Sequence, residues 1–142
     1  MTDKPAEYKW EDIELGQKQK FTLKITESML DSFATISGDR NPLHMDEGYA
    51  KKTSFGKRVC HGMLLASFFS RLVGMYMPGK NALYFSQSLN FKSPCFINDE
   101  VTVEGEVVDK SIATRIITLK TVIYNQLGTC LIDGLAKVVV RE

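Results

Sequence analysis

The sequence predicts an α+β fold in which an antiparallel sheet covers one buried helix. From Gly62 to about Tyr76 the residues are apolar almost all round, which is typical of a helix buried on most sides. From Tyr84 onward, apolar and polar residues alternate in successive strand-length segments separated by turn residues. Consecutive strands joined by short turns pair antiparallel, and the apolar face of such a sheet needs a cover, which the helix supplies.

The N-terminal half predicts one strand and two shorter helices. The first ten residues are expected to form a loose arm, and Lys18 to Ile25 alternates as a strand does. Thr26 can cap a helix from Glu27 to about Ser37, and Asp46 to Lys52 predicts a further helical turn. Three side chains at spacing i, i+4, i+7 predict the buried face of the longer helix: Met29, Phe33 and Ile36.

The C-terminal half predicts only strands. Pro78 and Gly79 end the buried helix. Turns are expected at residues 109–111 and 125–128. Strands are expected over residues 84–91, Val101–Val108, Ile112–Tyr124 and Thr129–Val140. The chain has no internal repeat, low-complexity tract or linker, so residues 1–142 are expected to form a single domain.

Composition narrows the class of protein. A net charge of +1 gives no broad electrostatic reason for nucleic-acid binding. The three cysteines, Cys60, Cys95 and Cys130, are widely spaced and match neither a disulfide framework nor a zinc site. The N-terminus is polar, so no signal peptide is expected, and the most apolar run contains Arg71 and is too short to span a membrane. The simplest expectation is a cytoplasmic protein with no membrane or nucleic-acid partner.

The motif that points to chemistry is Ser37-Gly38-Asp39-Arg40-Asn41-Pro42-Leu43-His44. Gly38 is a good helix C-cap and Pro42 cannot continue a helix, so Asp39 and His44 are expected on an irregular segment. A carboxylate and an imidazole together can hold a water molecule and move protons near neutral pH. The same composition is also ordinary turn chemistry, so the motif alone leaves both interpretations open.

A longer match favours the chemical interpretation. Residues 33–44, followed after five residues by Ala50, resemble the hydratase 2 signature of the MaoC-like dehydratases and R-specific enoyl-CoA hydratases. Residues 49–64 resemble the family's second block, and residues 83–94 with Asp99-Glu100-Val101 resemble a third. The resemblance is strongest to the single-domain hydratases that supply R-3-hydroxyacyl-CoA for polyhydroxyalkanoate synthesis. It implies a single hot-dog domain, in which an antiparallel sheet wraps around a long central helix.

The resemblance also implies roles for individual residues. Asp39 and His44 correspond to the catalytic pair, and Asn41 to a residue that orients the segment or the water. Gly62 corresponds to the glycine whose backbone N–H binds the thioester carbonyl. Ser70 and Val73 correspond to the acyl-pocket lining. The expected reaction is the reversible addition of water across the 2,3 double bond of an acyl-CoA, without metal or cofactor.

Other polar residues near the motif are assigned no role in catalysis. His61 is best explained as a capping or packing residue, and Cys60 as a small buried side chain. Four cationic residues are expected to be solvated surface, with contact to CoA phosphates as the alternative: Lys51, Lys52, Lys57 and Arg58.

Three other functions remain open at this point. The first is a dehydratase acting on acyl-carrier-protein thioesters, which needs the same chemistry. The second is a thioesterase on the same fold, because fold alone does not specify a reaction. The third is a non-catalytic acyl-binding or scaffold subunit. In each case a homodimer is expected, because an isolated sheet with open edges around so apolar a helix would be a poor monomer.

Overall fold

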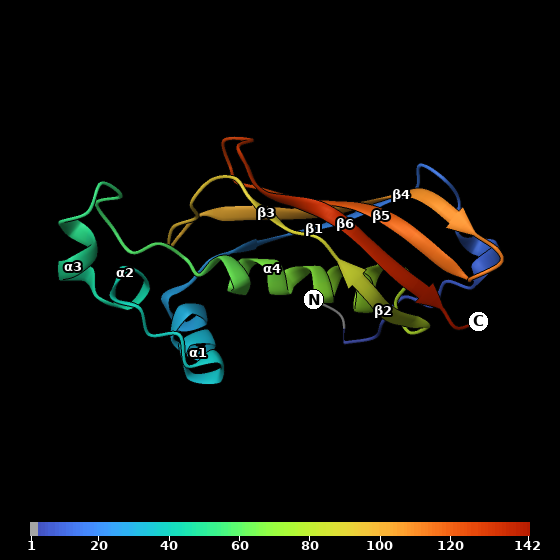
Figure 1. Cartoon of the computed structure of the whole chain (residues 1–142), viewed down its shortest axis with the longest axis horizontal. Coiled ribbons are helices and arrows are strands. Elements are labelled where there is room, and N and C mark those ends of the chain that lie inside the picture. The colour runs from blue at the N-terminus through green and yellow to red at the C-terminus, as the bar shows by residue number, and fades with distance from the viewer. Residues whose placement is uncertain (1–2) are drawn as a thin grey trace.

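The computed structural model describes residues 3–142. Within them, six strands form one sheet in which every pairing is antiparallel, in the order β1, β4, β5, β6, β2, with β3 also paired to β6. The strands are β1 (Lys18–Lys24), β2 (Ala82–Gln87), β3 (Asn90–Phe91), β4 (Glu100–Ser111), β5 (Ile116–Tyr124) and β6 (Cys130–Val140). Figure 1 shows this sheet lying along the helix α4 (Gly62–Arg71). The arrangement is the expected hot-dog fold.

Helix α4 supplies much of the core, and one π-helical turn, η2 (Leu72–Tyr76), extends it. Its buried side chains face the sheet: Leu64, Leu65, Ala66 and Phe69, followed by Leu72 and Val73 of η2. The sheet passes so close that a Cβ on Gly105 of β4 would lie 2.9 Å from Cδ2 of Leu72. The expectation of burial on most sides was too broad, because Met63, Ser67 and Ser70 are exposed along one face of α4.

The smaller helices lie beyond one end of the sheet (Figure 1). They are α1 (Glu27–Ser37), α2 (Pro42–Met45) and α3 (Glu47–Lys51). As predicted, Thr26 caps α1, and its hydroxyl accepts the N–H of Met29 at 3.2 Å. The predicted buried face was partly wrong: α1 buries Leu30 and Ala34, whereas Ile36 is 85% exposed. Ile36 lies in the last turn of a helix that projects past the sheet, where no partner covers it within the described residues.

The N-terminal segment is held in place rather than loose. Residues 1–2 of the expected arm lie outside the described residues. After them, the N–H of Ala6 bonds the carbonyl of Met75 at 2.9 Å, and the N–H of Tyr8 bonds that of Pro78 at 3.2 Å. Trp10 is buried and begins a short 3-10 helix, η1 (Trp10–Asp12). The polar composition of this segment concealed its backbone bonds to the end of the buried helix.

The turn between β4 and β5 lies later than predicted. β4 continues through Asp109 and Lys110 to Ser111, and the turn occupies residues 112–115. The Nζ of Lys110 donates to the carbonyls of Trp10 at 2.9 Å and Ile13 at 2.6 Å, which keeps this polar stretch on the sheet. The second predicted turn is confirmed: the carboxamide of Asn125 accepts the N–H groups of Leu127 and Thr129, both at 3.0 Å.

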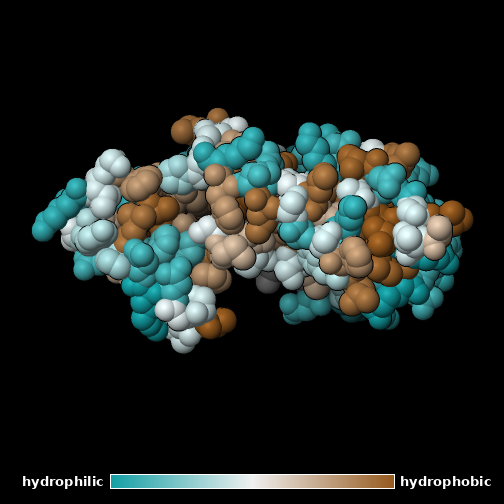
Figure 2. Space-filling view, in the orientation of Figure 1, coloured by the Kyte–Doolittle hydropathy of each residue, from teal (hydrophilic) through white to brown (hydrophobic). Residues whose placement is uncertain are grey.

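The two edge strands of the sheet differ in character. β1 presents exposed lysines, whereas β2 and β3 expose the large apolar side chains of Leu83, Tyr84, Phe85 and Phe91. The space-filling view shows hydrophobic residues, in brown, breaking the hydrophilic surface on the face drawn (Figure 2). No helix of the described residues is long and apolar enough to cross a membrane.

Candidate active site

Asp39 lies where the chain leaves α1. Gly38 takes a left-handed conformation with φ of 78°, and its N–H bonds the carbonyl of Ala34 at 2.9 Å, which ends the helix. The hydroxyl of Ser37 donates to the carbonyl of Phe33 at 2.7 Å and accepts the N–H of Asp39 at 3.0 Å. Asp39 therefore follows directly on a fixed turn, with its carboxylate exposed.

His44 reaches the same place from α2. Asn41 caps this helix, because its side-chain oxygen accepts the N–H of Leu43 at 3.0 Å. The N–H of Asn41 also donates to Oδ1 of Asp39 at 3.2 Å, so Asn41 orients the segment and the carboxylate together. The Nδ1 of His44 lies 2.7 Å from the carbonyl of Val59. Because a carbonyl only accepts, Nδ1 carries the hydrogen, so in the neutral form of the ring the lone pair is on Nε2.

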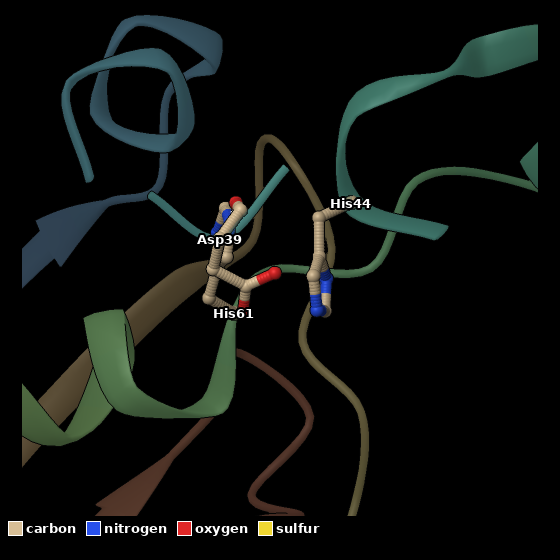
Figure 3. A group of neighbouring side chains, drawn as sticks. All are labelled: Asp39, His44 and His61. Atoms are coloured by element: carbon tan, nitrogen blue, oxygen red, sulfur yellow. The ribbon is translucent and has the colours of Figure 1, made fainter. Parts of the chain in front are cut away.

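A third side chain, His61, completes the cluster. One ligand atom each from Asp39, His44 and His61 lies within 4.8 Å of the others. Figure 3 shows the carboxylate of Asp39 directed toward the ring of His44. The two imidazole rings stack with centroids 4.2 Å apart. A water molecule placed among these groups could meet a carboxylate oxygen and an imidazole nitrogen at once, which suits general acid–base catalysis.

The burial of His61 favours the neutral form of its ring. Desolvation lowers the pKa of His61 below its ordinary value, because water cannot solvate a charged imidazolium at this buried position. The ring is therefore neutral near pH 7. Two imidazoles and a carboxylate are also groups that can ligate a divalent cation. The Nε2 of His61 lies 3.0 Å from the carbonyl of Asp39, so in this ring only Nδ1 has a lone pair without a partner among the described residues.

Gly62 begins α4 beside this cluster. Its N–H is one of the first N–H groups of the helix, and it has no hydrogen-bond acceptor among the described residues. The positive end of the helix dipole favours negative charge at this point. The ring of Phe91 covers the glycine, since a Cβ there would lie 2.8 Å from Cε1 of that ring. Gly62 and His44 line the same cavity of about 390 Å³, together with Cys60, Cys95 and Phe91.

The two residues expected to line the acyl pocket differ in their exposure to solvent. Ser70 is exposed and lines a groove of about 510 Å³ along the open face of α4, which we call the Ser70 groove. The other residues of this groove are Phe33, Met63, Ala66, Ser67, Phe69, Tyr84, Gln87 and Leu89. Val73 is buried in a core cluster with Trp10, Ile13 and Val107. Partial burial of its ring raises the pKa of Tyr84 to about 12, and its hydroxyl donates to Oε1 of Gln87 within the groove.

The basic residues beside the motif divide into two kinds. Lys51, Lys52 and Lys57 are exposed, as expected. Arg58 was wrongly expected to be solvated surface, because only 6% of its side chain is exposed. Its Nε donates to the carbonyl of His44 at 2.6 Å, and Nη1 donates to Glu27 of α1 at 2.9 Å. Sequence reasoning missed this role, because the partners of Arg58 lie 14 and 31 residues away.

The cysteines near the site are buried thiols. Cys60 is buried as expected, and its N–H bonds the carbonyl of Cys95 at 2.7 Å. The side chain of Cys60, followed by burial, raises the pKa of the Cys95 thiol, which therefore stays protonated at neutral pH. All three cysteines are free.

Comparisons with known proteins identify the family of the chain. Residues 11–126 match the model of the family described as "MaoC like domain". The chain is 43% identical to an (R)-specific enoyl-CoA hydratase of Aeromonas caviae, over 90% of this chain and 96% of that protein. It is 40% identical to an (R)-specific enoyl-CoA hydratase of Rhodospirillum rubrum, over 92% of this chain and 90% of that protein.

The fold is similar to a solved structure of the same kind. The unliganded R-hydratase PhaJ1 of Pseudomonas aeruginosa superimposes with a TM-score of 0.91 at 36% identity, over 94% of this chain and 86% of that chain. The family match covers most of the sequence and includes the segment with Asp39, His44 and Gly62. This chain therefore belongs to the MaoC-like domain family.

Proposed function

We propose that this protein is an R-specific enoyl-CoA hydratase, which reversibly adds water to a trans-2-enoyl-CoA to give an R-3-hydroxyacyl-CoA. The observation that supports this most directly is the cluster of Asp39, His44 and His61 within 4.8 Å, next to the first N–H of the buried helix α4. These groups match the needs of the reaction, which are a base for water and a donor for the thioester oxygen. The relatives named (R)-specific enoyl-CoA hydratase point to the same reaction.

Asp39 and His44 are proposed to handle the water molecule. Asp39 accepts a proton from the water, whose oxygen bonds to the β-carbon, while the lone pair on Nε2 of His44 orients the water. The α-carbon then receives a proton from the same pair, so no proton is gained or lost overall. A positioned acid–base group of this kind contributes about 10² to 10⁴ in rate. Because both groups lie on one segment, water and proton arrive from one face, which agrees with a single stereochemical product.

Gly62 is proposed to hold the charge that builds on the thioester oxygen. As the β-carbon is attacked, electrons move toward that oxygen, and the free N–H at the start of α4 can donate to it. Removing one such donor from an active site costs about 3 kcal/mol of transition-state stabilisation. Ser70 is proposed to line the acyl pocket through its groove, and Val73 to form the buried floor toward which the acyl chain extends.

The test is the loss of enoyl-thioester absorbance when crotonyl-CoA is mixed with the purified protein. Rapid loss with R-3-hydroxybutyryl-CoA as product is expected, with a fall in kcat of at least about 100-fold in Asp39→Asn, which keeps the size of the side chain but removes the base. Arg40→Gln is the matched control, because it changes the charge of the adjacent exposed residue. Full activity of Asp39→Asn would remove Asp39 from the mechanism.

The same assay separates the other functions. Matched thioesters of CoA and of acyl carrier protein are compared, and hydration of the CoA ester is expected to be faster. A preference for the carrier-protein thioester would instead make the protein a dehydratase of fatty acid or polyketide synthesis. Release of free thiol would indicate a thioesterase, and inertness toward all of these substrates an acyl-binding scaffold.

We further propose that the protein is a homodimer whose sheets pair along the β2 and β3 edge. Leu83, Phe85 and Phe91 are large, apolar and exposed on that edge. The exposed carboxylate of Asp39 and the open Ser70 groove would then be covered by the partner, which excludes bulk water from the reaction. Light scattering on Phe85→Lys is expected to show a monomer with reduced activity, whereas Lys20→Glu on the opposite edge should stay dimeric. A wild-type protein that is an active monomer would refute the dimer.

A further inference from the structure

His61 makes a hydrogen bond and two ring contacts in the site, which is more than a residue that only fills space requires. It is 1% exposed and immediately precedes Gly62 and helix α4. Its side chain does not cap the helix, since it makes no capping hydrogen bond. Its ring instead stacks on His44, with an angle of 28° between the rings, and meets Phe33 at a tilt of 58° with centroids 4.9 Å apart.

One hydrogen bond of His61 reaches the segment of the proposed base. Its Nε2 lies 3.0 Å from the backbone carbonyl of Asp39, 22 residues earlier in the chain. The carbonyl can only accept, so Nε2 carries the hydrogen and donates it. The other ring nitrogen, Nδ1, is buried and has no partner among the described residues. The ring is therefore a neutral imidazole with one fixed tautomer, whose single polar contact is to the backbone of Asp39.

His61 thus joins the three groups of the proposed mechanism. Its Nε2–H donates to the backbone carbonyl of Asp39, and its ring stacks on the ring of His44. It also directly precedes Gly62, whose N–H belongs to the peptide bond between the two residues. We propose that His61 is a positioning residue for hydration, which sets the distance between the Asp39 carboxylate and the His44 imidazole. This inference rests on the roles proposed above for Asp39 and His44.

Asp39 lies on an exposed segment, so its position must be held by hydrogen bonds from other residues. The backbone of Asp39 is otherwise held by its own N–H to Ser37 and by the turn at Gly38, both on the α1 side. Val59 and Arg58 hold the His44 end of the segment, whereas the bond from His61 ties the Asp39 end to the start of α4, and so to the N–H of Gly62. Without it, the carboxylate keeps its bond from the N–H of Asn41 but loses its hydrogen-bonded link to α4. A displacement of about 1 Å at a reacting group can cost on the order of 10² in rate.

Two substitutions separate the polar contact from the packing. His61→Phe keeps an aromatic ring to stack on His44 but has no N–H to donate. His61→Gln keeps an N–H donor of similar reach but lacks the ring. We expect His61→Phe to lower kcat about 10- to 100-fold with KM changed less than about threefold, because the donor acts on geometry rather than on substrate binding. His61→Gln is expected to recover part of that loss, and thermal unfolding of both variants confirms that they are folded.

A double-substitution cycle with Asp39→Asn shows whether His61 acts through Asp39. If it does, adding His61→Phe to Asp39→Asn produces little further loss of kcat, because the group being positioned is already gone. Losses that multiply in the double variant would overturn the inference, as would a wild-type kcat in His61→Phe. Should His61→Phe fail to fold, the same cycle is run with His61→Leu, which also has no N–H to donate.

The pH profile gives an independent check. Because the ring stays neutral, the profile of kcat/KM for His61→Gln should keep both limbs of the wild-type profile at reduced height. Loss of a limb would make His61 an acid or base and overturn the positioning role. The two proposals can be refuted independently. Full activity of Asp39→Asn would refute the role of Asp39. Loss of activity in Asp39→Asn together with wild-type activity in His61→Phe would refute only the role of His61.

Discussion

Arg58 offers a sharp test of how the site is held together, through the substitution Arg58→Met. The guanidinium is 6% exposed and links two elements: Nε donates to the carbonyl of His44 at 2.6 Å, and Nη1 donates to Glu27 of α1 at 2.9 Å. A weaker ion pair joins Nη2 to Asp31 at 3.7 Å. Methionine retains most of the apolar stem, so the substitution removes the charge and its bonds without opening a large cavity.

The contacts give the size of the effect. A hydrogen bond from a charged donor contributes about 1.5–3 kcal/mol, and this one satisfies a carbonyl that is otherwise half-buried. The side chains of Glu27 and Asp31 are 68% and 61% exposed. Their ion pairs with Arg58 therefore add no more than about 1 kcal/mol, because both carboxylates regain water when the arginine is lost. Removing a buried charge also relieves its desolvation cost, which offsets part of the loss. We expect a net loss of about 2 kcal/mol in the free energy of unfolding.

The assay is urea unfolding at pH 7 and one fixed protein concentration, since association would make the stability depend on concentration. Glu27→Gln is the matched control and should cost less than about 1 kcal/mol, because it removes only an exposed partner. Two results would refute the reasoning: an Arg58→Met protein within about 0.5 kcal/mol of wild type, or equal losses in the two variants. Equal losses would mean that the ion pair, rather than the bond to His44, carries the effect.

Two further predictions concern the same end of α4. Because burial lowers the pKa of His61, the unfolded chain binds a proton more readily below the ordinary histidine pKa of about 6.5. The free energy of unfolding should therefore fall as the pH drops through that region, by at most about 1.4 kcal/mol per pH unit from this residue. Urea unfolding at several pH values should show that His61→Phe lacks this contribution, and an unchanged slope would contradict it. In Gly62→Ala, the added Cβ would lie 2.8 Å from the ring of Phe91, so the ring must move and activity should fall. The stability losses of Gly62→Ala and Phe91→Ala should then be less than additive in the double variant, and strict additivity would show that the two positions do not interact.

The sequence predicted the elements whose signals are local. Thr26 at the start of α1, Gly38 at its end and the Asn125 turn all act within a few residues, and each lies where it was predicted. The errors came from contacts distant in sequence. Lys110 continues β4 because it reaches the carbonyls of Trp10 and Ile13, about 100 residues away. Periodicity also cannot show how far a helix projects from its sheet, which is why Ile36 was placed on the wrong face.

In the candidate site, too, the residues that were predicted lie close together in sequence, and the residues that were missed lie far from them. Asp39, Asn41 and His44 could be found because they share one short segment, and the structure brings the carboxylate and the imidazole together. His61 and Arg58 bond to that segment from beyond α3, and their hydrogen bonds to it are with backbone carbonyls, for which sequence has no signal. One usable clue did exist: a histidine immediately before a glycine that begins a buried helix lies close to any group that uses the N–H of that glycine.

The lysines of β1 affect how many molecules can join through the edges of their sheets. A sheet with two open edges can in principle add molecules at both and grow into a fibre. Lys18, Lys20 and Lys24 are exposed along β1, each opposite a glutamate of β4, and long charged side chains on an edge strand disfavour pairing with another strand. If two molecules pair along the β2 edge as proposed above, each presents its lysine-bearing β1 edge outward. Under that proposal the lysines of β1 disfavour further edge-to-edge growth beyond two copies and so limit aggregation.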